Sequence, residues 1–272
     1  MRFSVLASGS GGNACYVETS NSRIMIDAGL SCRELLRRME RIEVDPLKLD
    51  ALLITHEHID HIRGAGPLSR RLDIPVYINN RTLMRSRRIL GNISRPVVIH
   101  TGQAIAIRDL CLETFTKCHD AVDPMGVIVS SNGIRLGLLT DLGRSTTLVE
   151  DRLRGCQALI LEFNHDEEML QSGPYPLEVK RRIKGQDGHL SNVQAGSLVQ
   201  SVSHEDLKLV VLAHLSKINN DPQKALDEVE NALSTCGREG VRIIVSEQDQ
   251  PAPMVEFRPP RPCQGIPLDV FF

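Results

Sequence analysis

Four potential metal ligands fall within six residues, directly after an apolar run. The run Ala51–Thr55 predicts a buried strand, and the polar block that follows it reads His56-Glu57-His58-Ile59-Asp60-His61. Imidazole nitrogen suits zinc, manganese or iron, and a carboxylate adds the negative charge that imidazole lacks. This density of ligands argues against a surface loop that holds histidines by chance. The block therefore predicts a metal site on a loop at a strand end.

The spacing within the block divides its ligands between two ions. His56 and His58 are two positions apart and project to the same side, so they can hold one ion. Asp60 and His61 can turn towards a second ion, at the separation of about 3.5–4 Å that is typical of two-metal hydrolytic sites. Zinc and manganese both fit these ligands.

Three later positions extend the ligand set, each at the end of a predicted strand. His119 and Asp141 flank a hairpin signal at Asn132-Gly133, and His214 follows the strand Leu209–Leu212. Taken alone, an Asp after a strand is commonly a turn or a helix cap. Taken together, we expect His56, His58 and His119 on one ion, Asp60, His61 and His214 on the other, and Asp141 between them.

Such a centre predicts metal-assisted hydrolysis. A hydroxide held between two ions is a strong nucleophile at neutral pH, and Asp60 is a candidate for orienting the attacking water. The leaving group needs a proton, and His189 is our candidate general acid, with Glu162 as the carboxylate that tunes it. The alternative for His189 is a structural hydrogen bond at a helix start, and for His165 a structural role weighs about equally.

Composition predicts an ordinary globular chain with ample length for a large core. The chain has 272 residues, 41% hydrophobic and 24% charged, with a net charge of −2 that gives no overall attraction to nucleic acid. A strand-rich first half and alternating strands and helices in the second half favour an α+β fold. We expect a four-layer αββα sandwich, with two mixed β-sheets and helices on both outer faces.

The same sequence suggests a cytoplasmic protein. No apolar run approaches the length of about 18 residues expected of a transmembrane helix, and Met1–Ser8 is too short for a signal peptide. The seven cysteines include no C-x-x-C pair, which favours free thiols in a reducing compartment.

The metal block resembles the signature of the metallo-β-lactamase fold, and the order Glu162, His189, His214 is similar to the RNase Z branch. Further blocks resemble the YycJ/WalJ group of metallo-β-lactamase-fold exonucleases over roughly residues 1–250. These blocks are Glu162–Asp166, Gly173–Pro176, Gly188–Asn192 and Ala213–Asn220.

That resemblance implies 5′→3′ DNA exonuclease activity in bacteria, with a part in DNA repair. It implies that Asp141 bridges the two ions and that Asp27 supports the metal loop. The residues of the specific blocks become candidates for substrate binding, namely His165, Asp166, Ser191 and Asn192.

Basic clusters offer contacts for phosphate. They lie on predicted helices and comprise Arg33, Arg37, Arg38 and Arg41, then Arg70 and Arg71, then Arg81, Arg85, Arg87 and Arg88, and finally Lys180, Arg181, Arg182 and Lys184. Backbone phosphate binding and an ordinary solvated helix face are both open interpretations. An aromatic content of 3% argues against recognition by base stacking.

The last segment, residues 251–272, is proline-rich, and we expect it to form a tail with no regular element after a domain that spans residues 1–250. Leu268, Phe271 and Phe272 resemble the short peptide by which bacterial replication and repair proteins dock on the sliding clamp. That peptide normally has Gln where Pro267 stands. Docking of the tail on its own domain is the alternative.

Two other functions compete with a DNA exonuclease. The same fold could hydrolyse a small cyclic phosphodiester or thioester, or process RNA. A binding protein with a structural metal is a third option, although structural zinc sites are usually closed, four-ligand and cysteine-rich. Basic helices beside the site would favour a polymer, whereas a small enclosed pocket would favour a small molecule.

Overall fold

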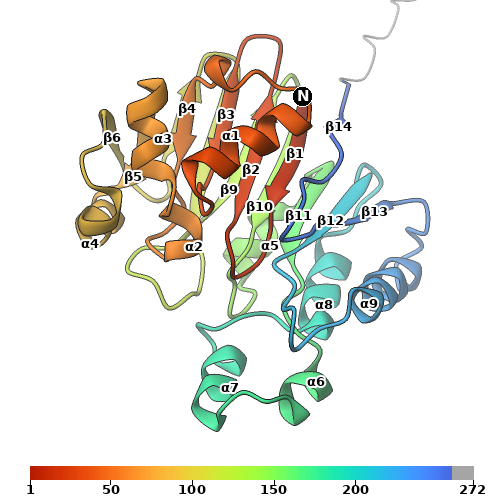
Figure 1. Cartoon of the computed structure of the whole chain (residues 1–272). Helices are drawn as coiled ribbons and strands as arrows, with labels where there is room; N and C mark the ends of the chain where they lie inside the picture. The colour runs from red at the N-terminus through yellow and green to blue at the C-terminus, as the bar shows by residue number, and fades with distance from the viewer. Residues whose placement is uncertain (259–272) are drawn as a thin grey trace, which may run out of the picture.

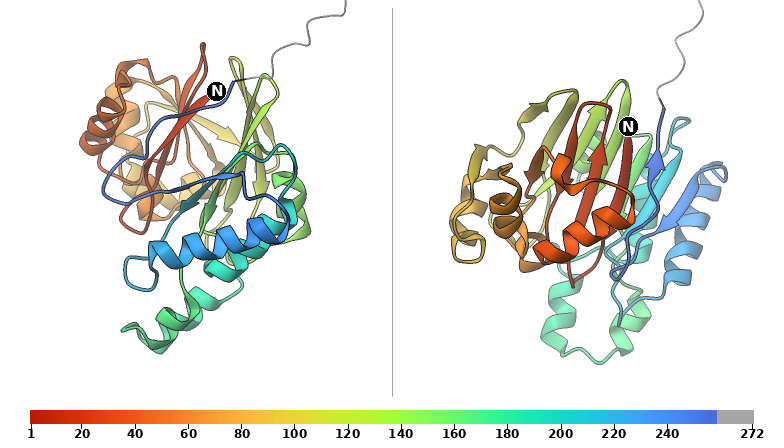
Figure 2. Two further views of the ribbon diagram at one scale, coloured as in Figure 1. Left: turned by 90° about the vertical axis from the view of Figure 1, so that its right-hand side faces the viewer. Right: turned by 45° about the horizontal axis from the view of Figure 1, so that its top comes forward.

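The computed structural model describes residues 1–258, which form two seven-stranded sheets packed face to face. Helices cover the outer face of each sheet (Figures 1 and 2). Both sheets mix antiparallel and parallel pairs, because each begins as a meander and continues through helical crossovers. The predicted αββα sandwich of two mixed sheets is therefore confirmed.

The first sheet contains, in spatial order, β14 (Val255–Glu256), β1 (Arg2–Ala7), β2 (Ala14–Glu18), β3 (Arg23–Ile26), β4 (Ala51–Leu53), β5 (Pro75–Asn79) and β6 (Arg95–Ile99). The second contains β13 (Arg242–Val245), β12 (Leu209–Ala213), β11 (Ala158–Glu162), β10 (Ile134–Leu139), β9 (Met125–Ser131), β8 (Leu110–Thr116) and β7 (Ala104–Ile107). The central core lies between them and joins side chains such as Val17 and Leu53 to Val129 and Leu138.

The helices fall into three groups. Beside the first sheet lie α1 (Cys32–Arg41), the 3₁₀ turn η1 (Pro46–Lys48), α2 (Ile59–Ile62), α3 (Ala65–Leu72) and α4 (Asn80–Leu90). Beside the second lie α5 (Thr147–Leu153), α8 (Asn192–Val202) and α9 (Pro222–Thr235). The remaining pair, α6 (Glu167–Ser172) and α7 (Leu177–Lys184), projects beyond the sheet edge at the bottom of Figure 1.

Turn and cap chemistry explains several element boundaries. Asn132 and Gly133 join β9 to β10 with φ of 50° and 79°, as a type I′ hairpin turn requires. The side chain of Asn79 accepts the capping hydrogen bond from Thr82 N at 2.8 Å, so Asn79 and not Asn80 caps α4. Asn79 ends the preceding strand as well, and local sequence does not distinguish the two neighbouring asparagines.

The segment after Gln250 contains a short strand, whereas we expected no regular element there. Val255–Glu256 forms β14, which pairs antiparallel with β1. The ring of Phe257 stacks on Phe3 with centroids 6.2 Å apart, because the exposed edge of β1 offers both unpaired backbone groups and an apolar side chain. The folded unit thus extends beyond residue 250. The residues proposed to dock on a clamp, Leu268, Phe271 and Phe272, lie outside the described residues.

Within residues 1–258, no helix is long and apolar enough to cross a membrane.

Candidate metal centre

The predicted ligands meet at one edge of the molecule, where strands of both sheets end. In parallel strands the carboxyl ends share an edge, where ligands commonly bind. The first sheet delivers the block His56–His61 after β4, and the second delivers Asp141 after β10 and His214 after β12. Asp141 and His214 both have φ of 56°, a left-handed conformation that is rare outside glycine and often found at functional sites.

The first group comprises His56, His58 and His119, whose ligand atoms lie within 4.8 Å of one another. His119 places Nδ1 3.2 Å from the carbonyl of Gly188 and Nε2 3.1 Å from Nδ1 of His58. His56 places Nδ1 3.0 Å from Oγ1 of Thr55. In His56 and His119 one nitrogen therefore has an outer partner, which orients the other towards the shared centre.

The second group comprises Asp60, His61, Asp141 and His214. Nδ1 of His61 contacts Asp27 at 2.7 Å, and its Nε2 lies 3.0 Å from Oδ2 of Asp141. Nε2 of His214 lies 3.4 Å from the other oxygen of Asp141. Asp141 is also 4.0 Å from Nε2 of His119, so its carboxylate lies between the two groups.

Two buried nitrogens in this centre, His56 Nε2 and His214 Nε2, have no hydrogen-bond partner among residues 1–258. Buried polar atoms normally have partners, so the centre is incomplete without a positively charged ligand. Imidazole nitrogens and carboxylate oxygens, all turned inwards, are the donor set that zinc or manganese takes. The residues present therefore fit a divalent cation.

Burial and neighbouring charges set the protonation of the ligands. Burial lowers the pKa of His119 to about 4 and lowers that of His56 well below its usual value. Burial opposes a charge on His61 as well, but Asp141 and Asp27 outweigh it and raise the pKa of His61 to about 10. Asp141 remains ionised, because His214 and His61 lower its pKa against the effect of burial. Without a cation, the centre therefore combines the neutral imidazoles of His56 and His119 with the protonated His61 and the buried carboxylate of Asp141.

Glu162 connects this centre to His189. Its fully buried carboxylate places Oε1 2.7 Å from Nδ1 of His189 and 3.0 Å from Nδ1 of His214, and Oε2 accepts from Leu142 N at 2.8 Å. Burial would raise the pKa of Glu162, but His189 and His214 lower it to about 2. The side chain of His189 is 19% exposed, so its other nitrogen is the one that substrate can reach.

The residues predicted to bind substrate have other partners. Asp166 caps α6 through Met169 N at 2.9 Å, and Ser191 caps α8 in a capping box. Asn192 is buried and exchanges two side-chain hydrogen bonds with Asn220. These three residues hold the loops around the site, and their direct contact with substrate stays a prediction.

His165 differs from these three. It is 2% exposed, and its buried Nδ1 has no hydrogen-bond partner in the described part of the chain.

Sequence reasoning missed residues that orient the ligands. Nδ2 of Asn13, from the glycine-rich loop after β1, lies 3.0 Å from Nε2 of His61 and 3.1 Å from Asp60. Asp120 lies 3.4 Å from Nε2 of His119 and pairs with Arg182 of α7 at 2.5 Å. The adjacency of Asp120 to His119 was an available signal, whereas the position of Asn13 depends on tertiary packing alone.

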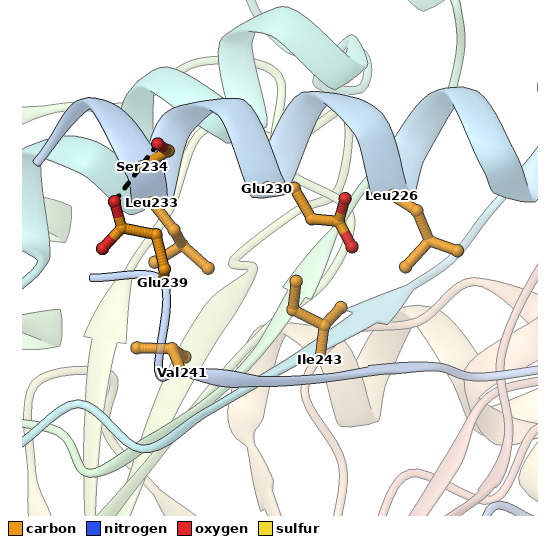
Figure 3. Close-up of a pocket in the computed structure, with 7 residues that line it drawn as sticks. All are labelled: Leu226, Glu230, Leu233, Ser234, Glu239, Val241 and Ile243. Atoms are coloured by element: carbon orange, nitrogen blue, oxygen red, sulfur yellow. Dashed lines mark hydrogen bonds between the residues drawn. The ribbon is translucent and has the colours of Figure 1, made fainter. Parts of the chain in front are cut away.

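A second concave region lies beside β13, the edge strand of the second sheet. A cavity of about 450 Å³ separates α9 from β13 and is lined by Leu226, Glu230, Leu233, Ser234, Glu239, Val241 and Ile243 (Figure 3). None of these side chains is a histidine, and Glu239 already accepts from Ser234 at 3.3 Å. We therefore assign the chemistry to the metal centre.

The sandwich and its histidine–aspartate centre define a hydrolase of the metallo-β-lactamase fold. The family model of the β-lactamase superfamily domain matches residues 22–215. Exodeoxyribonuclease YycJ of Bacillus anthracis is 37% identical over 239 residues, which cover 87% of this chain and 90% of that protein.

Exodeoxyribonuclease WalJ of Streptococcus pneumoniae is 36% identical, over 86% of this chain and 88% of its own. Among solved structures, the metallo-β-lactamase fold protein YhfI from Bacillus subtilis superimposes with a TM-score of 0.71 at 14% identity, over 92% of this chain and 98% of that one. The chain belongs to the β-lactamase superfamily and, within it, to the YycJ/WalJ group.

Proposed function

We propose that the protein is a two-metal nuclease that hydrolyses DNA phosphodiester bonds as a 5′→3′ exonuclease. The observation that carries this proposal is the Glu162–His189 pair beside the metal centre, since it adds a proton donor to a cluster of ligands. Similarity to exodeoxyribonucleases YycJ and WalJ supports DNA as the substrate.

Two divalent cations, zinc or manganese, would occupy the centre. His56, His58 and His119 would hold one cation, Asp60, His61 and His214 the other, and Asp141 would serve both. When bound, such ions lower the pKa of a coordinated water and neutralise charge on a phosphoryl group. The outer partners of the histidines keep the ligand nitrogens directed inwards.

Residues of the chain would orient the attacking water and transfer the proton to the leaving group. Asp60 is half-buried, with its carboxylate 3.7 Å from Nε2 of His214, and we assign it the orientation of the attacking water. We assign His189 the transfer of a proton to the leaving oxygen. The ionised Glu162 accepts from Nδ1 of His189, so it fixes the ring and stabilises the protonated imidazole before transfer.

The rim of the centre favours a polyanionic substrate over a small molecule. Helix α7 carries Lys180, Arg181, Arg182 and Lys184, and it contributes no buried side chain to the core. Its Arg182 contacts Asp120, which lies beside His58 and His119. A basic helix thus borders the metal centre, where phosphates that flank a scissile bond would pass.

The test is digestion of single- and double-stranded DNA labelled at the 5′ or the 3′ end, with manganese added. We expect stepwise loss of nucleotides from the 5′ end. Asp141→Asn is the matched control, because asparagine tolerates the left-handed backbone of this position. Loss of the 3′ end first would overturn the polarity, and inert DNA with active cleavage of RNA or of a cyclic diester would overturn the substrate.

The proposed cellular context and partners rest on the cysteines and on the C-terminal sequence. The free cysteines among the described residues suit a reducing cytoplasm, where we propose that the enzyme takes part in DNA repair. Docking on a sliding clamp through Leu268, Phe271 and Phe272 stays a prediction from the sequence. Deletion of Gly265–Phe272 with unchanged clamp binding would show that prediction to be wrong.

A further inference from the structure

The segment between the metal block and β7 has a charge unlike that of the rest of the chain. Between Ile62 and Ile99 there are eight arginines and one acidic residue, Asp73, in a protein whose net charge is −2. The arginines are Arg63, Arg70, Arg71, Arg81, Arg85, Arg87, Arg88 and Arg95. All eight are exposed, so this surface attracts anions although the whole protein does not.

Helix α4 concentrates this charge in a regular stripe. Arg81, Arg85 and Arg88 are spaced at i, i+4 and i+7, so they share one helix face. At the α-helical rise of 1.5 Å per residue the stripe is about 10 Å long. The opposite face of α4 is buried through Thr82, Ser86 and Leu90, which fixes the stripe towards solvent.

Among the described residues, these guanidinium groups lack the carboxylate partner that Arg37 and Arg38 have on α1. On α1, Arg37 and Arg38 both bind Glu34 at 2.7 Å, whereas α4 has no acidic residue. Within residues 1–258, no carboxylate lies within 4 Å of any of the eight arginines. Arginine presents a planar fork of donors that matches a phosphate group.

The amino-terminal end of α4 is linked to the loops that carry the metal ligands. Asn79, the cap of α4, donates through Nδ2 to the carbonyl of Asp123 at 2.7 Å. Val122 of the same loop donates to Glu57 at 2.9 Å, and this loop carries His119. Helices α2 and α4 are also in contact, and Figure 1 shows them next to each other. Arg81, in the first turn of α4, is thus the stripe residue nearest to the ligand loops.

We propose that the stripe Arg81–Arg85–Arg88 is a binding site for the phosphate backbone of DNA that extends away from the metal centre. This inference rests on the proposed function and adds to it a path for the uncleaved part of the substrate. Because the contacts are to phosphates, the stripe supplies affinity without sequence preference. It raises the affinity for long strands and leaves the chemistry at the metal centre unchanged.

The test compares the metal-loaded wild type with the triple variant R81A/R85A/R88A. Binding is measured by fluorescence anisotropy of a long phosphorothioate oligodeoxynucleotide, which resists cleavage, over a series of salt concentrations. We expect Kd to rise about tenfold or more, and the slope of log affinity against log salt to fall by about 2, at about 0.7 per phosphate contact on a single strand. Turnover of bis(p-nitrophenyl) phosphate should stay at the wild-type rate.

The matched control is K208A/R238A/R242A. These three cations lie at the amino-terminal ends of β12 and β13, at the opposite end of β12 from His214. Their replacement by alanine removes the same amount of positive charge as the first triple variant. None of the three has a carboxylate partner within 4 Å among the described residues. An equal loss of binding in both triple variants, or no loss in the first, would overturn the proposal. A wild type that binds DNA through the stripe but cuts none would instead overturn the proposed function.

Discussion

Nδ1 of His189 lies 2.7 Å from Oε1 of Glu162, within a pair that adjoins the metal ligands without belonging to the ligand set that we assign. If His189 delivers the proton to the leaving group, His189→Ala should retain bound metal and lose turnover on DNA by ~10²-fold or more. Metal content is checked by elemental analysis. A diester with a p-nitrophenolate leaving group needs no proton, so it should be cleaved at nearly the wild-type rate. An equal loss on both substrates would assign His189 a structural role.

A second prediction concerns Asp27, which accepts from Thr55 N and Oγ1 at 2.8 Å and contacts His61 at 2.7 Å. Asp27→Asn keeps the size of the side chain and tolerates φ of 60°, but it weakens the orientation of His61. We expect metal affinity to fall by 10–100-fold, as measured by competition with a chelating dye. Activity should return when the metal concentration is raised. Unchanged affinity would mean that Asp27 serves the fold alone.

The hairpin turn gives a third prediction. Gly133 has φ of 79°, and an added Cβ would meet no atom within 4 Å, so Gly133→Ala tests backbone strain alone. We expect a loss of about 1–2 kcal/mol and a fall in Tm of about 2–4 °C for each kcal/mol, measured by thermal unfolding. Gly240→Ala is the control, because that glycine is equally open and its φ is not left-handed. Equal Tm values for the two variants would contradict the prediction.

A fourth prediction concerns the C-terminal boundary of the folded unit, which two truncated chains can test. A chain that stops at Gln250 loses β14, the hydrogen bond from Ala252 N to Val5 O at 2.8 Å, and the ring of Phe257 against Phe3. We expect it to unfold at lower temperature and to aggregate through the freed edge of β1. A chain that stops at Arg258 keeps these contacts and should match the full-length protein in Tm. Equal stability of both truncated chains would place the boundary at residue 250 after all.

The sequence predicted best those features that depend on residues close together in the chain. Dense ligands after a strand identify His56–His61, and an Asn-Gly pair identifies the turn of β9 and β10, because both signals depend on near neighbours. Arg182 of α7 and Asp120 meet only in three dimensions, and no spacing predicts that contact. Asp166 and Ser191 are predicted to bind substrate because they lie in specific blocks. Such blocks equally mark residues that cap helices and hold a site together.

The division of the metal centre between the two sheets has a consequence for the folded state. His56 to His61 belong to one half of the sandwich, whereas His119, Asp141 and His214 belong to the other. Cations that bind across this boundary would link the two halves of the sandwich. Because they bind only the folded protein, their binding would raise its free energy of unfolding. At a free concentration of 100 times Kd, one such ion contributes about 2.7 kcal/mol. Loss of the metal would thus make the protein more susceptible to proteolysis, in addition to abolishing its activity.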